Sequence, residues 1–229
     1  MKVLAIGAHP DDIEIFMFGL ISICKQRGDD IYLAIATDGS AGNVLDFPHL
    51  SRIRKTETLE ALKNLGTPHF FNFSDGKLAF TASPIEHLKK YIYSIEPDLI
   101  ITHAPEDYHP DHSTLSNFIK LAAGFMCPIL YADTLMGVNF IPDYYIDITK
   151  VFMEKKEAIL IHKSQNPERF LNSTTLLNRF RSAQCNSSDG HYAEAFRFEK
   201  RFPYSDIRSL LPPSPGINQF YKSLSTSLI

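Results

Sequence analysis

The chain of 229 residues contains no tryptophan and three cysteines. Cys24, Cys127 and Cys185 lie far apart and form no Cys-x-x-Cys pair, which argues against a disulfide framework and favours reduced thiols in a cytoplasmic protein. No segment approaches about 20 uninterrupted apolar residues, so we expect no transmembrane helix. The apolar run at the N-terminus stops at residues 9–12 with His-Pro-Asp-Asp, before a secretory signal would be complete.

An excess of either charge is lacking as well, because 23 basic residues face 26 acidic ones and the formal net charge is -3. We therefore expect neither nucleic acid nor a membrane surface as a partner, and a small neutral or mildly polar ligand fits better. With 44% hydrophobic residues, the length suits one domain over residues 1–229. Its core would span about 2–200, and an extended, proline-containing arm would follow at about 203–229.

Apolar runs and helical spacings alternate along most of the chain. Strands are predicted at 3–6, 31–36, 69–73, 98–102, 128–131 and 144–148, and helices at 13–27, 51–65, 83–95, 113–125 and 151–162. The alternation favours a Rossmann-like three-layer α/β/α sandwich with a mostly parallel sheet. In the helix at 51–65, Ser51 is the expected N-cap and Leu59 belongs to the expected apolar side. After residue 164 the pattern weakens, with a helix at 174–185 and a late edge strand at 191–198.

Two clusters of polar side chains follow predicted strands. Ala8-His9-Pro10-Asp11-Asp12-Ile13-Glu14 comes after the first strand, and Asp107-Tyr108-His109-Pro110-Asp111-His112 comes after the strand at 98–102. Open α/β sheets bind ligands at the carboxyl ends of their strands, so the two clusters can converge. The glycine-rich loop at 37–43 should border the same crevice.

Metal-assisted hydrolysis of an amide suits these side chains. Three of them would ligate the metal and leave a position for water, as in catalytic zinc sites: His9, Asp12 and His112. Asp11, adjacent but spare, would be the general base. His109, kept protonated by Asp111, would stabilise the oxyanion and protonate the leaving amine.

The two clusters closely resemble the signatures of the LmbE-like, or PIG-L, family of zinc-dependent de-N-acetylases, which includes deacetylases of mycothiol and bacillithiol synthesis. The likeness continues through Arg54-x-x-Glu57 and the Asp75-Gly76 turn and covers about residues 2–200. It implies a hydrolase that removes the N-acetyl group from an N-acetylglucosamine-type amino sugar on a small conjugate or sugar nucleotide. Family members commonly form homo-oligomers, and the arm at 203–229 could contribute to one.

The resemblance also implies a role for each matching residue. The zinc ligands would be His9, Asp12 and His112, the base Asp11, the acid and electrostatic catalyst His109, and its orienting partner Asp111. The hydroxyls of the amino sugar would be held by Arg54 and Asp75. In the mycothiol enzymes a tyrosine two residues before the first histidine of the second motif takes part, but Asp107 stands there in this chain.

Other interpretations stay open at this point. Two histidines and one carboxylate also bind Fe2+ in the facial triad of oxygenases, although such an enzyme has no use for Asp11. A non-catalytic sugar-binding module could share the scaffold. The aspartates after the first strand could simply cap a helix, and Arg54 with Glu57 could form an exposed helical ion pair.

Overall fold

The computed structural model describes residues 1–42 and 49–218, and its strands form one seven-stranded sheet in the order β3-β2-β1-β4-β5-β7-β6. The strands are β1 (Lys2–Gly7), β2 (Asp30–Thr37), β3 (His69–Phe73), β4 (Leu99–His103), β5 (Ile129–Ala132), β6 (Tyr144–Asp147) and β7 (Ala193–Phe198). The first five are parallel, and β7 runs antiparallel to both β5 and β6. The predicted mostly parallel sheet is confirmed.

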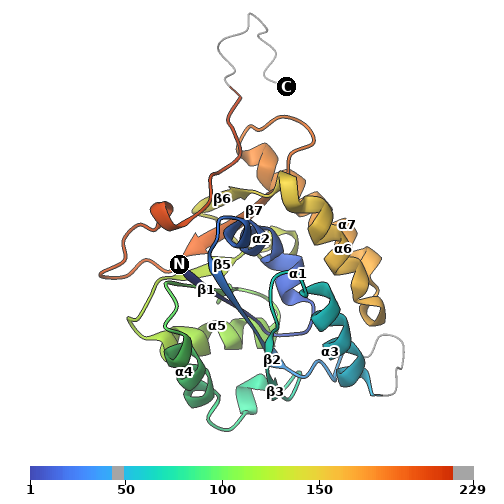
Figure 1. Ribbon diagram of the computed structural model, residues 1–229, viewed down its shortest axis with the longest axis vertical. Coiled ribbons are helices and arrows are strands. Elements are labelled where there is room, and N and C mark those ends of the chain that lie inside the picture. The colour runs from blue at the N-terminus through green and yellow to red at the C-terminus, as the bar shows by residue number, and fades with distance from the viewer. Residues whose placement is uncertain (43–48, 219–229) are drawn as a thin grey trace, which may run out of the picture.

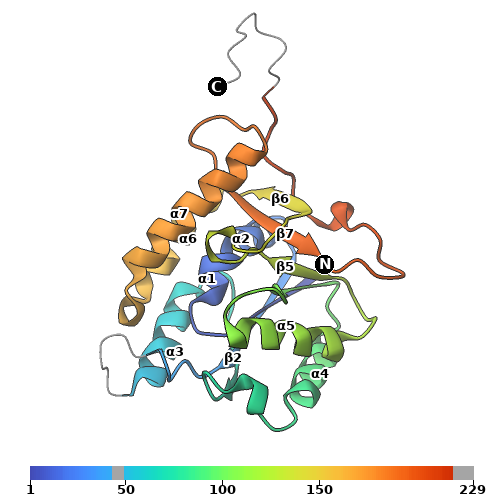
Figure 2. The same ribbon diagram turned by 180° about the vertical axis from the view of Figure 1, so that it is seen from behind.

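Helices cover both faces of this sheet (Figures 1 and 2). They are α1 (Asp12–Phe16), α2 (Phe18–Gln26), α3 (Leu50–Ala61), α4 (Pro84–Ile95), α5 (Pro110–Ala123), α6 (Phe152–Ile161) and α7 (Pro167–Gln184). One core lies between the sheet and α4 with α5, and the other lies under α1, α2 and α6. This is the three-layer α/β/α sandwich expected from the sequence. No helix in the described ranges combines the length and hydrophobicity of a membrane span.

The late strand is the main correction to the predicted topology. The sequence places an edge strand at 191–198, but β7 pairs with β5 on one side and β6 on the other, so β6 is the edge. β7 is buried along nearly its whole length, including the carboxylate of Glu194. That carboxylate accepts hydrogen bonds from the backbone N–H groups of Gly19 and Leu20, at 2.8 Å each, and pairs with the fully buried Lys155 at 2.7 Å.

These contacts explain why the single helix predicted at 13–27 is two helices. Met17 has a φ of -132°, which separates α1 from α2, and Glu194 receives the free N–H groups at the start of α2. A residue far away in sequence thus takes the place of a local cap. The break lets α1 follow its own direction from the turn after β1.

The predicted N-cap of one helix, the predicted starts of two others and one residue of a predicted apolar side are also wrong. His49, with a φ of 61°, precedes α3, so Ser51 lies inside the helix and is no N-cap. Leu59 is 38% exposed, whereas the buried face of α3 carries Arg54 and Thr58. α5 begins at residue 110 instead of 113, and α7 at residue 167 instead of 174, each with a proline in its first turn.

The chain after β7 returns across the sheet. Ile207 and Leu211 are buried in the same core as α2 and α6. The end of the predicted arm, 219–229, and the last residue of the predicted loop at 37–43 lie outside the described residues.

Candidate active site

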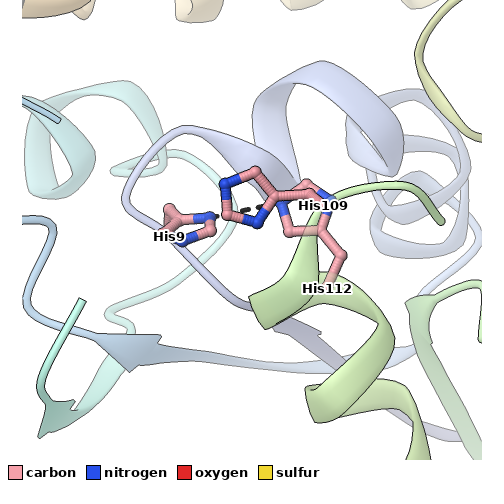
Figure 3. A group of neighbouring side chains, drawn as sticks. All are labelled: His9, His109 and His112. Carbon is pink, nitrogen blue, oxygen red and sulfur yellow. Dashed lines mark hydrogen bonds between the residues drawn. The ribbon is translucent and has the colours of Figure 1, made fainter. Parts of the chain in front are cut away.

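The two motifs meet at the carboxyl ends of β1 and β4, which are neighbours in the sheet. His9 lies in the turn between β1 and α1, His109 immediately precedes α5, and His112 lies in the first turn of α5. Figure 3 shows the three imidazoles facing one another across the space between these segments. All three are buried or half-buried, and the nitrogens of His9 and His112 contact each other and nearby carboxylates.

Three side chains have donor atoms at the spacing of metal ligands. His9 Nδ1 lies 3.2 Å from His112 Nε2, and the carboxylate of Asp12 lies 3.3 Å from each of these nitrogens, through Oδ2 to His9 and through Oδ1 to His112. A tetrahedral metal with bonds of about 2.0–2.1 Å separates its ligand atoms by about 3.3 Å. Among the described residues, three overlapping groups of three possible donors contain these side chains: His9 with His109 and His112, Asp12 with His103 and His112, and His9 with Asp75 and Asp111. The residues present therefore fit a divalent metal such as zinc.

Each of these two histidines has a carboxylate at its other nitrogen. His112 Nδ1 lies 3.0 Å from Asp107, while His9 Nε2 lies 3.2 Å from Asp75 and 3.4 Å from Asp111. Such partners fix the tautomer of a metal-binding imidazole and leave the first nitrogen free to coordinate. The sequence interpretation identified Asp75 and Asp111 but missed this shared function, and it gave Asp107 no role. The sequence signal for Asp107 was its place in Asp-x-His-Pro-Asp-His, close before both His109 and His112.

The electrostatics of the cluster favour positive charge. Burial lowers the pKa of His9, but Asp12, Asp111 and Asp75 outweigh it and raise that pKa well above its ordinary value. The pKa of His112 is raised to about 9, because Asp12 and Asp107 overcome its burial. The same carboxylates that stabilise imidazolium would stabilise a bound cation.

Asp11 is held in a strained conformation beside these donors. Its φ of 131° is uncommon for a residue with a side chain and marks the tight turn between β1 and α1. Its carboxylate makes no capping hydrogen bond and instead lies 3.1 Å from Arg54 Nη2. Burial raises the pKa of Asp11 in spite of the guanidinium. The capping interpretation of this turn is therefore wrong.

Arg54 is 3% exposed and joins the loops around Asp11. Its guanidinium donates to the carbonyls of Pro10 at 2.8 Å and Gly39 at 3.1 Å, and it crosses Gly42 so closely that a Cβ there would lie 2.6 Å from Nη1. Glu57 accepts from the backbone and hydroxyl of Ser164. The exposed ion pair considered from the sequence does not form, because both side chains of α3 point into the protein.

His109 and Asp111 interact differently from the prediction. The Asp111 carboxylate does not hold the His109 ring; it accepts from the backbone N–H of Gly76 at 2.7 Å and of Leu78 at 3.3 Å, and it contacts His9. The backbone N–H of Asp111 instead donates to His109 Nδ1 at 3.3 Å. Burial and the neighbouring His112 lower the pKa of His109, so the ring is neutral, with its proton on Nε2.

His103 packs against the proposed metal ligands His112 and Asp12. Its ring stacks on that of His112 with centroids 3.8 Å apart, and its Nε2 lies 3.0 Å from the Asp12 carboxylate. Burial and His112 lower the pKa of His103 to about 4, which keeps it neutral. His162, also at a buried position, pairs with Glu14 at 2.8 Å. Both histidines therefore contact residues of the two motifs without being part of them.

A pocket of about 300 Å³ opens over the cluster. It is lined by the predicted residues His9, Asp11, Asp12, Arg54, Asp75, His109 and His112, and also by Ile15, Phe16, Ala41, Gly42, Gly76, Tyr108, Leu135, Gln165 and Phe170. Asp111 lies behind His9 and Gly76. Phe170 and Leu135 carry no sequence signal of their own, because they come from segments far along the chain that the fold brings to the pocket.

Known proteins resemble this chain in sequence and in fold. The diacetylchitobiose deacetylase of Thermococcus kodakarensis is 28% identical over 86% of this chain and 82% of its own length. An N,N'-diacetylchitobiose deacetylase structure from Pyrococcus horikoshii has a TM-score of 0.75 at 24% identity, covering 86% of this chain and 83% of that one. The 4-carboxy-2-hydroxymuconate hydratase of Pseudomonas putida also has a TM-score of 0.75, at 18% identity, with coverage of 90% and 99%.

The two structural matches show the fold alone, since one fold can carry different reactions. The family comparison adds the sequence pattern, because its match begins in β1 and ends with α5 and so includes both motifs. With residues 4–123 matched, slightly more than half of its length, this chain belongs to the PIG-L family, that of the GlcNAc-PI de-N-acetylases.

Proposed function

We propose that this protein is a zinc-dependent hydrolase that removes the acetyl group from an N-acetylglucosamine-type amino sugar. The observation that carries the proposal is the trio of donors at tetrahedral spacing with a spare carboxylate, Asp11, buried beside it in the same pocket. The relatedness to a diacetylchitobiose deacetylase supports an N-acetylated amino sugar as the substrate. An oxygenase would leave Asp11 without a task.

The metal ligands in this proposal are His9 through Nδ1, Asp12 through its carboxylate and His112 through Nε2. When bound to these residues, zinc would supply a water with a pKa of about 7 and a Lewis acid for the amide carbonyl. The nitrogens that face away from the metal stay protonated because carboxylates accept from them, Asp107 from His112 and the pair Asp75 and Asp111 from His9.

Asp11 is the general base in this mechanism. Its carboxylate lines the pocket, and burial raises its pKa toward the range in which it can accept and later release a proton. The ion pair with Arg54, at 3.1 Å, holds the carboxylate in place and favours its ionised form. Arg54 therefore acts on the reaction through Asp11, because its donors are already used by the protein.

His109 supplies the electrophilic assistance. Since its Nδ1 accepts from the Asp111 backbone, the proton of the neutral ring lies on Nε2, available to a substrate oxygen in the pocket. The proton that Asp11 takes from the attacking water would pass from Asp11 to the leaving nitrogen, which releases acetic acid and the free amine, while His109 only donates its Nε2–H to the substrate oxygen. Asp75 and Gln165 line the polar wall where the hydroxyls of the sugar would bind.

Acetate release is the direct test. Metal-stripped protein is reloaded with zinc or Fe2+ and assayed on N-acetylglucosamine and its simple glycosides, together with Asp11→Asn and a control, Asp30→Asn, at an exposed position of β2. We expect turnover by the wild type and the control, and a loss of about 10²- to 10⁴-fold in Asp11→Asn with metal binding retained.

Other results would decide against the proposal. A metal-loaded wild type that binds these sugars without releasing acetate would identify a binding module. Oxygen uptake by the Fe2+ form with a 2-oxo acid would identify an oxygenase. Full activity of Asp11→Asn would remove Asp11 from the mechanism while leaving the metal site in place.

A further inference from the structure

We propose that the outer wall of the active-site pocket binds an uncharged, apolar group attached to the amino sugar, so that alkyl or aryl glycosides are better substrates than sugar nucleotides. The inference rests on the proposed deacetylase function. It concerns a part of the pocket that has no place in the chemistry of the amide itself: Tyr108, Leu135 and Phe170, here called the outer wall.

The residues that line the pocket form two sets of different chemistry. The polar set includes Asp75 and Gln165 together with the backbone of Gly42, whose carbonyl accepts from Gln165 Nε2 at 2.9 Å, and these polar groups suit the hydroxyls of a sugar. The apolar set consists of apolar and aromatic side chains from three separate helical segments: Ile15 and Phe16 from α1, Leu135 from η2 (Leu135–Gly137) and Phe170 from α7. Tyr108 extends it from the loop before α5.

The apolar set includes residues next to the metal ligands and residues near the mouth of the pocket. Phe16 is 8% exposed and meets the rings of His103 and His112 edge-on, with centroids 5.6 Å and 5.8 Å away, so it lies next to the metal ligands. The small acetyl methyl group suits this inner place. Leu135 and Phe170 are half-buried and Tyr108 is 58% exposed, so these three lie toward the mouth, where the remainder of the substrate would leave the pocket.

Charge argues against an anionic group at this mouth. Among the lining residues that the structure describes, the one permanently charged cation is Arg54, which is already paired with Asp11. Asp11, Asp12 and Asp75 add negative charge nearby. At the outer wall, away from the proposed metal, a pyrophosphate would be desolvated against Tyr108, Leu135 and Phe170, none of which is a cation, whereas an aryl or alkyl group would bury their exposed apolar surface. Arg169, which is exposed beside Phe170, is the cation that a phosphate could reach from outside.

The experiment compares substrates on the metal-loaded full chain. Acetate release is measured for the methyl and phenyl glycosides of N-acetylglucosamine in both anomers, and for UDP-N-acetylglucosamine. We expect kcat/KM for the phenyl glycoside to exceed that for the methyl glycoside by at least about tenfold, mainly through KM, because one added apolar contact in a pocket is worth about that factor. The sugar nucleotide should be no better than the methyl glycoside.

Variants test which side chains cause the preference for the phenyl glycoside. Leu135→Ser and Phe170→Ser, on different segments, should each lower the phenyl-to-methyl ratio, while Leu176→Ser, on the exposed side of α7, should leave it unchanged. Thermal unfolding checks that each variant is folded. Because Leu135 and Phe170 change independently, a folding defect in one leaves the other as the test.

Three outcomes would overturn the inference without touching the deacetylase proposal. The first is a ratio of kcat/KM between the phenyl and methyl glycosides near one. The second is a preference for the sugar nucleotide that Arg169→Ala removes. The third is a rate that rises with the length of the N-acyl group and not with the size of the glycoside, which would assign the outer wall to the acyl chain. Failure of the deacetylase proposal looks different, since the methyl glycoside itself would then release no acetate.

Discussion

Replacing Asp107 by asparagine should weaken zinc binding although Asp107 touches no metal. One oxygen of Asp107 lies 3.0 Å from His112 Nδ1, and the other accepts the backbone N–H of His109 at 2.8 Å. An asparagine has one oxygen and one NH2 group, so it can satisfy only one of these two donors. Either His112 loses its acceptor or the turn before α5 does.

The size of the effect follows from the number of carboxylates on each ligand. Among the described side chains, His112 has one carboxylate at its outer nitrogen, whereas His9 has two, Asp75 and Asp111. Loss of such a partner typically costs 10- to 100-fold in metal affinity, which is about 1.4 to 2.7 kcal/mol. We therefore expect that range for Asp107→Asn and a smaller loss for Asp75→Asn, because Asp111 still holds His9.

Competition with a chromophoric chelator at fixed pH measures the zinc Kd of each variant, and thermal unfolding of the metal-free proteins reports any general damage. His112→Ala serves as the reference for complete loss of a ligand. If Asp107→Asn binds zinc as the wild type does while His112→Ala does not, the carboxylate does not position the imidazole, and the reasoning is refuted.

Replacing Arg54 by methionine should lower the free energy of unfolding by about 3 to 5 kcal/mol, because it leaves the buried Asp11 carboxylate unpaired, whereas Arg52→Met on the exposed side of α3 should change little in the same denaturant titration. Burial lowers the pKa of His162, but Glu14, with Asp11 and Glu57, overcomes it and raises that pKa above the ordinary value of about 6.5. The stability from this charge is complete below that value and is lost as pH rises through the folded pKa, so Glu14→Gln should destabilise more at pH 6 than at pH 9. Removing zinc with a chelator should lower the melting temperature, since a ligand at 100 times its Kd contributes about 2.7 kcal/mol; an unchanged melting curve would contradict binding to the folded state.

The fold was largely predictable because its strands are simple in sequence. Parallel strands buried on both faces appear as short continuous apolar runs, and the strand predicted at 31–36 lies inside β2, whose last five residues are buried. The edge strand at 69–73 was also placed at its observed bounds. The helix predicted at 83–95 differs by one residue from α4, because Ser-Pro marks its start. The late part of the chain was less predictable, since the burial of β7 comes from pairing with strands on both sides and not from any run of its own.

The candidate site was likewise predictable in part. The residues of the two motifs were found in the sequence because metal ligands and a base need particular side chains next to strand ends. The partners of those residues were assigned less well. Asp111 was given to His109, but α5 begins at residue 110, and the resulting turn aims its carboxylate at His9 and at the backbone of Gly76 and Leu78.

By itself the sequence determined the chemistry that this protein can hold: two histidine and aspartate clusters, the strands that deliver them, and the family they resemble. Only the tertiary structure decided which nitrogen of each imidazole is free, that Arg54 serves Asp11, and that Leu135 and Phe170 reach the pocket. The physical reason is that local patterns fix which groups are present and where strands begin and end. The pairing of buried charges and the lining of a cavity depend mainly on contacts between segments far apart in the chain, whose distances no local pattern encodes.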